Sequence, residues 1–94
     1  MPKVKPSDIE VSRRVVKACI SGNMDLYGLD EGVIAVKLGV TQRTVQNKRI
    51  KPETLTLDEL WNLSKALKFT PVQAASIVLG RPITSKEIKE FIML

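Results

Sequence analysis

Helix start and stop signals recur along this chain, and they constrain its fold more than any other feature. Thr41, Thr56 and Thr70 each stand just before a run of helix-compatible residues, where a hydroxyl can accept a hydrogen bond from the free amides of a first turn. Gly39 and Gly80 each follow such a run, where glycine can end a helix by taking a positive φ. No stretch between these signals alternates apolar and polar residues as a strand would. The sequence therefore predicts an all-α fold without strands.

The same signals divide the chain into a compact bundle of five to six short helices. We expect the first helix to be capped by Ser7, with Glu10 at the reciprocal capping position, and to end at Gly22. The other helices are expected at residues 31–38, 42–50, 57–69, 71–79 and about 85–93, with Pro52 in a connection.

Apolar residues at helical spacing predict the core. Trp61 lies within an amphipathic helix, so we expect it to pack in the core rather than to stack on a base. Tyr27 is expected to anchor the loop after the first helix, and Ile88 and Phe91 to pack against that helix. The other expected inward positions are Ile9, Val16, Cys19 or Ile20, Ile34, Leu38, Val45, Leu57, Leu60, Leu63 or Ser64, and Leu67.

Length and composition indicate a single domain over residues 1–94, with 44% hydrophobic residues. No apolar run approaches the roughly 20 residues of a membrane span, and the N-terminus lacks the apolar core of a secretory signal, so we expect a cytoplasmic protein. With one cysteine and no histidine, a disulfide or a zinc site is not expected, and Cys19 is interpreted as a structural thiol. The sequence also offers no Gly-rich phosphate loop or catalytic constellation. We therefore expect no enzymatic activity, no cofactor, no metal and no small-molecule ligand.

Positive charge is concentrated in one segment. Five basic residues and no acidic residue lie between Gly32 and Pro52, whereas the rest of the chain is balanced at ten against ten. The formal net charge of +5 therefore belongs to this segment. A confined excess of positive charge is typical of a phosphate-binding face.

The segment 31–50 also has the spacing of two helices that cross at a tight turn. Ala35 is small enough for the second helix to approach, and Gly39 can take a positive φ at the turn. Val45 can then fill the angle between the helices. These positions predict a helix-turn-helix at about residues 31–50.

Residues 30–70 resemble the helix-turn-helix of the phage Cro and repressor family, also called the xenobiotic-response-element family. The resemblance includes "LTLDELWNLSKALKFTP", which is similar to the fourth helix of that family and the turn after it. It implies a lambda-repressor-like fold in which the helix at 42–50 enters the major groove of duplex DNA.

The resemblance also implies a set of DNA contacts. The side chains expected to contact bases are Gln42, Arg43, Thr44, Gln46 and Asn47. Those expected to contact phosphates are Lys37, Thr41, Lys48, Arg49 and Lys51. The alternative interpretation of the same residues is that they only solubilise an exposed helix face.

Three positions depart from the family pattern. Glu31 stands where the family commonly has a glutamine that meets a phosphate, and a carboxylate would repel that phosphate. Lys48 stands where an apolar residue usually packs on the core, so either its stem must snorkel or Ile50 must replace it. The polar turn after the third helix is replaced by "RIKPET", residues 49–54.

Two functions follow from these residues. The first is a sequence-specific regulator of transcription that binds double-stranded DNA, with the apolar C-terminal segment as a homodimer seam that would match a palindromic site. The second is a protein-interaction module, an adaptor or antitoxin-like chain that uses the same scaffold without specific DNA binding.

Overall fold

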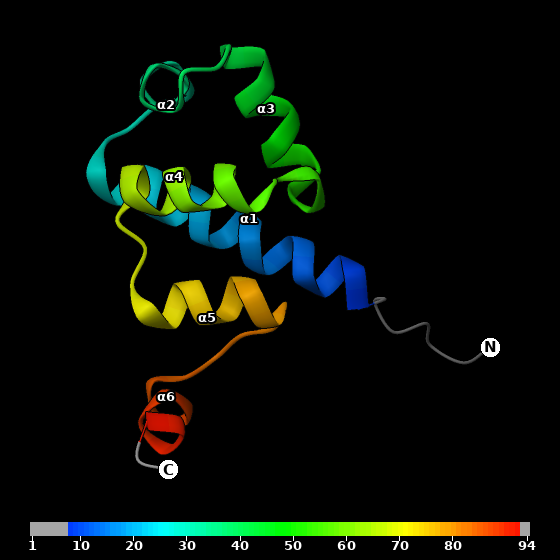
Figure 1. Ribbon diagram of the computed structural model, residues 1–94, viewed down its shortest axis with the longest axis vertical. Coiled ribbons are helices and arrows are strands. Elements are labelled where there is room, and N and C mark those ends of the chain that lie inside the picture. Colours follow the sequence, from blue (N-terminus) through cyan, green and yellow to red (C-terminus); the bar gives the residue numbers. More distant parts are fainter. Residues whose placement is uncertain (1–7, 93–94) are drawn as a thin grey trace, which may run out of the picture.

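The structure is a computed structural model that describes the backbone of residues 8–92 and the side chains of residues 8–90, and it is all-helical there (Figure 1). Ser7, expected to cap the first helix, and the side chain of Phe91 lie outside the described residues. The elements are α1 (Asp8–Tyr27), α2 (Glu31–Leu38), α3 (Gln42–Ile50), the 3-10 turn η1 (Pro52–Thr54), α4 (Leu57–Leu67), α5 (Pro71–Leu79) and α6 (Ser85–Ile92). The prediction of an all-α bundle of five to six helices is confirmed, although α1, at 20 residues, is not short. None of the described helices is long and apolar enough to cross a lipid bilayer.

Most of these helices begin at the residues that the sequence indicated. The hydroxyls of Thr41, Thr56 and Thr70 each accept a hydrogen bond from an amide in the first turn of the helix that follows. The side chains of Glu59 and Gln73 in turn accept hydrogen bonds from the backbone amides of Thr56 and Thr70, which completes two capping boxes. These bonds satisfy amides that have no partner within a helix, and so they fix where α3, α4 and α5 start.

Helix α1 is longer than predicted, because it continues through Gly22 to Tyr27. A glycine inside a helix costs about 1 kcal/mol relative to alanine. The next turn offsets that cost by packing: Met24 is buried, and the buried Asn23 amide donates 2.8 Å to the Leu67 carbonyl. Asn23 also exchanges hydrogen bonds with Gln73 of α5. Tertiary contacts therefore override the local stop signal.

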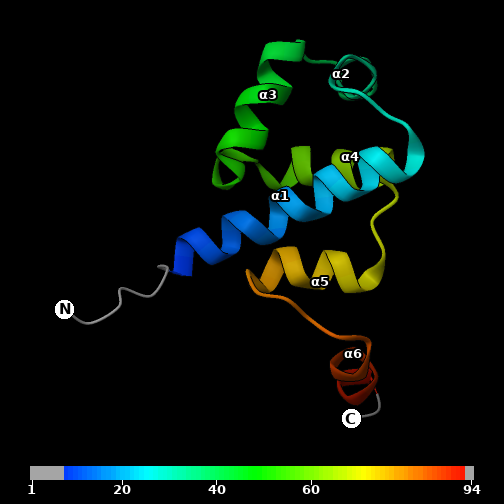
Figure 2. The same cartoon turned by 180° about the vertical axis from the view of Figure 1, so that it is seen from behind.

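Helix α1 is central to the arrangement, with α4 alongside it, α5 on one side, and α2 and α3 on the other (Figures 1 and 2). Ile34 and Leu67 are fully buried between these helices. The core is completed by Val16, Ile20, Met24, Ala35, Val45 and Leu63, with Leu29, Leu38, Val40, Leu55, Phe69 and Ile77 packed around it.

The prediction that Trp61 packs in the core is wrong, since 58% of the residue is exposed, and Leu57 is similarly exposed. Residues two apart on a helix point about 200° from each other, so Trp61 and Leu63 cannot both face inward. Leu63 takes the core position together with Leu67, which follows it by one turn. Leu57 and Trp61 therefore lie one turn apart on the outer side of α4.

Ile9 and Tyr27 are exposed as well, although both were expected to face inward. Ile9 lies in the first turn of α1, at the N-terminal end of this central helix. The Tyr27 ring does not reach the core and instead lies 5.2 Å from the Lys68 ammonium, a cation–π contact. Lys68 adopts φ 53°, which ends α4 two residues earlier than predicted.

Helix α6 lies beyond α5 in both views, apart from α1 (Figures 1 and 2). It ends at Ile92, close to the predicted end at about residue 93. Ile88 is half-buried, and the buried Ile83 of the preceding link is held by a hydrogen bond from its amide to the Ser76 hydroxyl. The expected packing of α6 along α1 is therefore not what positions this helix.

Candidate nucleic-acid interface

Helices α2 and α3 meet at a tight turn. Gly39 has φ 68°, and the amide of Val40 donates to the Ala35 carbonyl at 3.0 Å, which closes the end of α2. Ala35 and Val45 are both buried where the helices approach. Figure 1 shows α2 end-on while α3 runs down the page, so the two helices cross steeply. The small residue, the glycine and the inward valine therefore occupy the positions that the sequence indicated.

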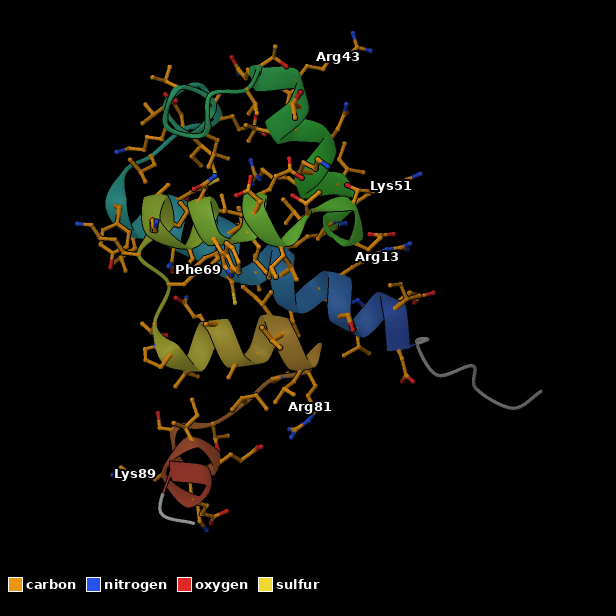
Figure 3. All side chains as sticks on the ribbon, in the orientation of Figure 1. Arg13, Arg43, Lys51, Phe69, Arg81 and Lys89 are labelled. Atoms are coloured by element: carbon orange, nitrogen blue, oxygen red, sulfur yellow. The ribbon has the colours of Figure 1, made fainter. Side chains whose placement is uncertain are left out.

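The first half of α3 presents its polar side chains outward. Gln42, Arg43, Gln46 and Asn47 are exposed, and Arg43 extends away from the body of the molecule (Figure 3). Thr44 is half-buried, and its hydroxyl shares a 2.9 Å hydrogen bond with the Thr41 hydroxyl. Four of the five expected base-contact residues are therefore accessible to a ligand, and Thr44 contributes to the helix cap.

Two of the expected phosphate-contact lysines are also exposed. Lys37 lies in the last turn of α2 and Lys51 follows α3, and Lys51 points outward in Figure 3. Among residues 8–90, no carboxylate forms an ion pair with Lys37, Arg43 or Lys51. Thr41 is exposed, but its oxygen already accepts the amide of Thr44 at 3.1 Å.

Lys48 is turned back toward the protein. Its ammonium donates 2.6 Å to the Thr54 carbonyl and lies 3.1 Å from a Glu59 carboxylate oxygen. Ile50 does not replace it, since 63% of Ile50 is exposed. Of the two alternatives for Lys48, the structure therefore shows the one in which its stem lies along the core and its charge is paired.

The Glu59 carboxylate is held in its charged form by these contacts. The pKa of Glu59 lies below its ordinary value, first because the Thr56 amide donates to the carboxylate and then because Lys48 does. One carboxylate thus joins the start of α4 to the last turn of α3.

Glu31 makes a second connection, which the sequence did not indicate. Arg49 Nη1 lies 3.0 Å from Glu31 Oε2, and Arg49 Nη2 donates 3.1 Å to the Ser21 hydroxyl. The Gln46 amide nitrogen donates 3.3 Å to the other Glu31 oxygen. Helices α1, α2 and α3 are therefore joined by one group of four residues, which we call the Glu31 cluster: Ser21, Glu31, Gln46 and Arg49.

The Glu31 cluster resolves the first departure from the family pattern. The carboxylate of Glu31 is neutralised by Arg49, so it is not an isolated negative charge beside the basic face. The cost is that Arg49, like Lys48, is engaged within the protein. A sequence signal existed only in part: Gln46 and Arg49 are three residues apart and share a helix face, but nothing in the sequence placed Glu31 beside them.

A further ion pair joins Arg13 of α1 to Glu53 of η1. Arg13 lies near Lys51 in Figure 3. The Arg13 guanidinium holds the pKa of Glu53 below its ordinary value, chiefly through a hydrogen bond. The pair fixes the segment after α3 to α1, so "RIKPET" follows a defined course.

Other chemistry has little support among the described residues. The cavity beneath α3 has a volume of about 20 Å³, which is room for about one water molecule, and the larger hollows, of about 190 to 590 Å³, are more open to solvent. No group of three His, Cys, Asp or Glu residues in the described part of the chain is placed to hold a metal ion. Cys19 is half-buried, and burial raises the pKa of its thiol, which lowers its nucleophilic fraction.

No protein-family model, curated protein or solved structure matches this chain. The functional argument therefore depends on the residues and their geometry.

Proposed function

We propose that this chain binds double-stranded DNA in a sequence-specific manner, with α2 and α3 as a helix-turn-helix of the Cro and repressor type, and that it is a small regulator of transcription. The observation that carries the proposal is the exposed first half of α3. Gln42, Arg43, Gln46 and Asn47 are presented together there, and no acid pairs with Arg43 among residues 8–90.

The chemistry of these side chains suits the edges of bases in a major groove. A guanidinium can donate to both O6 and N7 of guanine, and a carboxamide can pair with N6 and N7 of adenine. Arg43 is the principal candidate for a guanine contact, because it is exposed and points away from the other helices in Figure 3. Gln42, Gln46 and Asn47 supply the carboxamides.

Phosphate binding falls to fewer residues than the sequence predicted. Lys48 and Arg49 are in intramolecular ion pairs, so Lys37 and Lys51 are the side chains that we assign to the backbone. Lys37 lies in the last turn of α2 and Lys51 directly follows α3, so the two lysines precede and follow the reading helix along the chain. With about two phosphates neutralised by each protomer, the slope of log K against log salt should be near −2 for a monomer and near −4 for a dimer.

The test is a selection of bound sites from random duplexes, followed by titration at several salt concentrations. Lys51→Ala should weaken binding to all duplexes alike and reduce the salt slope by about 1 for each protomer bound, so by about 2 for a dimer. Lys65→Ala, which replaces an exposed lysine in the last turn of α4, is the matched control and should leave both quantities unchanged. Failure of the wild-type chain to bind any duplex at low salt would overturn the proposal.

A second candidate function, a protein-interaction module, is favoured by the exposed apolar side chains of α4. Leu57 and Trp61 lie one turn apart and are each more than half exposed. Large aromatic residues are frequent anchors of protein interfaces. Trp61→Ser in the same titrations separates the two functions: it should leave duplex binding intact if α3 is the interface.

We also propose a homodimer, formed through the C-terminal apolar segment, as the DNA-binding assembly. Two reading helices spaced about one DNA turn apart would meet a palindrome of two half-sites. A palindromic selected site, together with the mass of the complex, would support this assembly, and a single asymmetric half-site would contradict it.

A further inference from the structure

The Glu31 cluster constrains the chemistry that Gln46 can present to a base. A carboxylate has no hydrogen to donate, so only the nitrogen end of the Gln46 carboxamide can approach Glu31. The 3.3 Å contact is accordingly from Gln46 Nε2 to Glu31 Oε1. This orientation follows from the donor and acceptor inventory of the two groups, and it leaves the Gln46 carbonyl oxygen on the solvent side.

Glu31 is itself held in place by contacts independent of Gln46. Its other oxygen is 3.0 Å from Arg49, which also donates to Ser21 of α1. About a quarter of the Glu31 side chain is exposed, whereas Gln46 as a residue is exposed. The carboxylate is therefore the fixed partner, and the glutamine is the side chain that it orients.

We infer that Glu31 is a specificity-determining positioning residue, which fixes the Gln46 carboxamide so that it accepts adenine and rejects guanine. The inference rests on the proposed DNA binding through α3 and names the base preference of one position in the site.

The base preference follows from the groups that face the major groove. One Gln46 N–H is engaged by Glu31, and the carbonyl oxygen and the second N–H remain for a base. Adenine offers a donor at N6 and an acceptor at N7, which complement this pair. Guanine offers two acceptors, O6 and N7, so one of them would meet the carbonyl oxygen with no hydrogen between them.

Without Glu31, this discrimination is weaker, because the orientation of the carboxamide is no longer fixed. A glutamine with a free carboxamide can rotate by half a turn and present its NH₂ group to guanine instead. In Glu31→Gln, the new amide can donate or accept, so it supports either orientation of Gln46. The substitution also releases Arg49 from its ion pair with the carboxylate.

The experiment compares sites selected from random duplexes by the wild-type chain and by three variants. Gln46→Ala identifies the base pair that Gln46 contacts, because the preference should disappear at that position alone. There the wild-type chain should favour adenine over guanine by about tenfold. Glu31→Gln should reduce the ratio to about twofold or less while the affinity for DNA rises, since Arg49 is released from its ion pair and becomes available to a phosphate.

Arg49→Met is the matched control. It leaves the contact between Glu31 and Gln46 in place but removes the other partner of the carboxylate. It should lower the affinity for all duplexes and reduce the adenine preference by less than Glu31→Gln does, because the contact from Gln46 to Glu31 is retained while the second support of the carboxylate is lost. If it loses that preference as fully as Glu31→Gln does, the preference depends on the general seating of α3 and the inference is overturned.

A measurement without DNA tests the orientation directly. The side-chain amide protons of Gln46 should show one hydrogen-bonded resonance in the NMR spectrum of the wild-type protein. Glu31→Gln should shift this resonance, and Lys89→Ala should not. Unchanged resonances in Glu31→Gln would contradict the inference even if the protein binds DNA, whereas a chain that binds no duplex would instead overturn the proposed function.

Discussion

The two halves of α3 have similar compositions but different surroundings. The first half carries Gln42 and Arg43, which are exposed, and Arg43 has no ion pair with any acid of residues 8–90. The second half carries Lys48 and Arg49, which are half-buried and paired with Glu59 and Glu31. Basic residues within one helix thus divide into those available to a ligand and those that attach the helix to its neighbours.

The comparison shows that a local excess of positive charge in the sequence overestimates the basic surface that a ligand can reach. The acids that pair with Lys48 and Arg49 come from α4 and α2, outside the acid-free segment of the sequence. The basic side chains of this segment that remain available to phosphates and bases are Lys37, Arg43 and Lys51. The proposed interface is therefore smaller than the sequence suggested, and it is concentrated at the first half of α3 and its two flanks.

The largest expected effect tests this division at Arg43. Arg43→Ala should reduce affinity for the selected site by about tenfold to a hundredfold, because a bidentate base contact discriminates by ~1–3 kcal/mol. Its unfolding free energy should change by less than about 0.5 kcal/mol, as expected for an exposed side chain. Binding isotherms and denaturant unfolding measure the two quantities. If Arg43→Ala destabilises the fold and leaves binding intact, the two halves have been assigned the wrong roles.

The next effect concerns the turn that aims the first half of α3. Gly39→Ala should destabilise the protein by about 1 kcal/mol, because φ is 68° there, a conformation costly for a residue with a Cβ. Gly22→Ala is the matched control within α1, where it should stabilise the protein by about 0.5–1 kcal/mol. Neither added Cβ would meet another atom within 4 Å, so backbone conformation alone sets the two signs. Equal changes in the two variants by thermal unfolding would contradict this account.

A smaller effect sharpens the role of the second half. A double-mutant cycle of Glu31→Gln and Arg49→Met should give a coupling free energy of roughly 0.5–1 kcal/mol, the upper range for a partly exposed ion pair. The cycle with Arg43→Ala in place of Arg49→Met should give no coupling. A coupling of zero in the first cycle would mean that the ion pair does not help to attach α3.

The smallest effect is the pH dependence of the link from α3 to α4. The pKa of Glu59 is lowered from 4.5 in the folded protein, so its contribution to stability is present above pH 4.5 and is lost as the pH falls through the folded value. Denaturation midpoints measured from pH 6 down to about pH 3 should therefore fall less steeply in Glu59→Gln, which retains a side chain able to cap α4.

Glu53→Gln is the parallel control, because the pKa of Glu53 is also lowered, chiefly by Arg13. The two variants should each remove part of the acid dependence. If the denaturation midpoint of Glu59→Gln depends on pH in the same way as that of the wild-type protein, the charge of Glu59 does not stabilise the link between α3 and α4.

Much of the fold was predictable because its signals are local. The start of α3 depends on the Thr41 cap, and its crossing with α2 on Gly39, groups that act within a few residues of the chain. The predictions that were wrong concern choices between faces or between competing packings. Trp61 and Leu63 were both apolar candidates for one inward face, and only the positions of α1 and α2 around α4 select Leu63.

The sequence by itself determined most helix starts, the tight turn after α2, and a segment at residues 42–51 rich in amide and basic side chains. Each depends on backbone hydrogen bonds and side-chain chemistry within one or two helical turns. Tertiary structure alone decided which charges stay available, because Glu31 lies 18 residues from Arg49 along the chain yet 3.0 Å away in space. Charge pairing depends on distance after folding, and that distance is set by the packing of α1, α2 and α3.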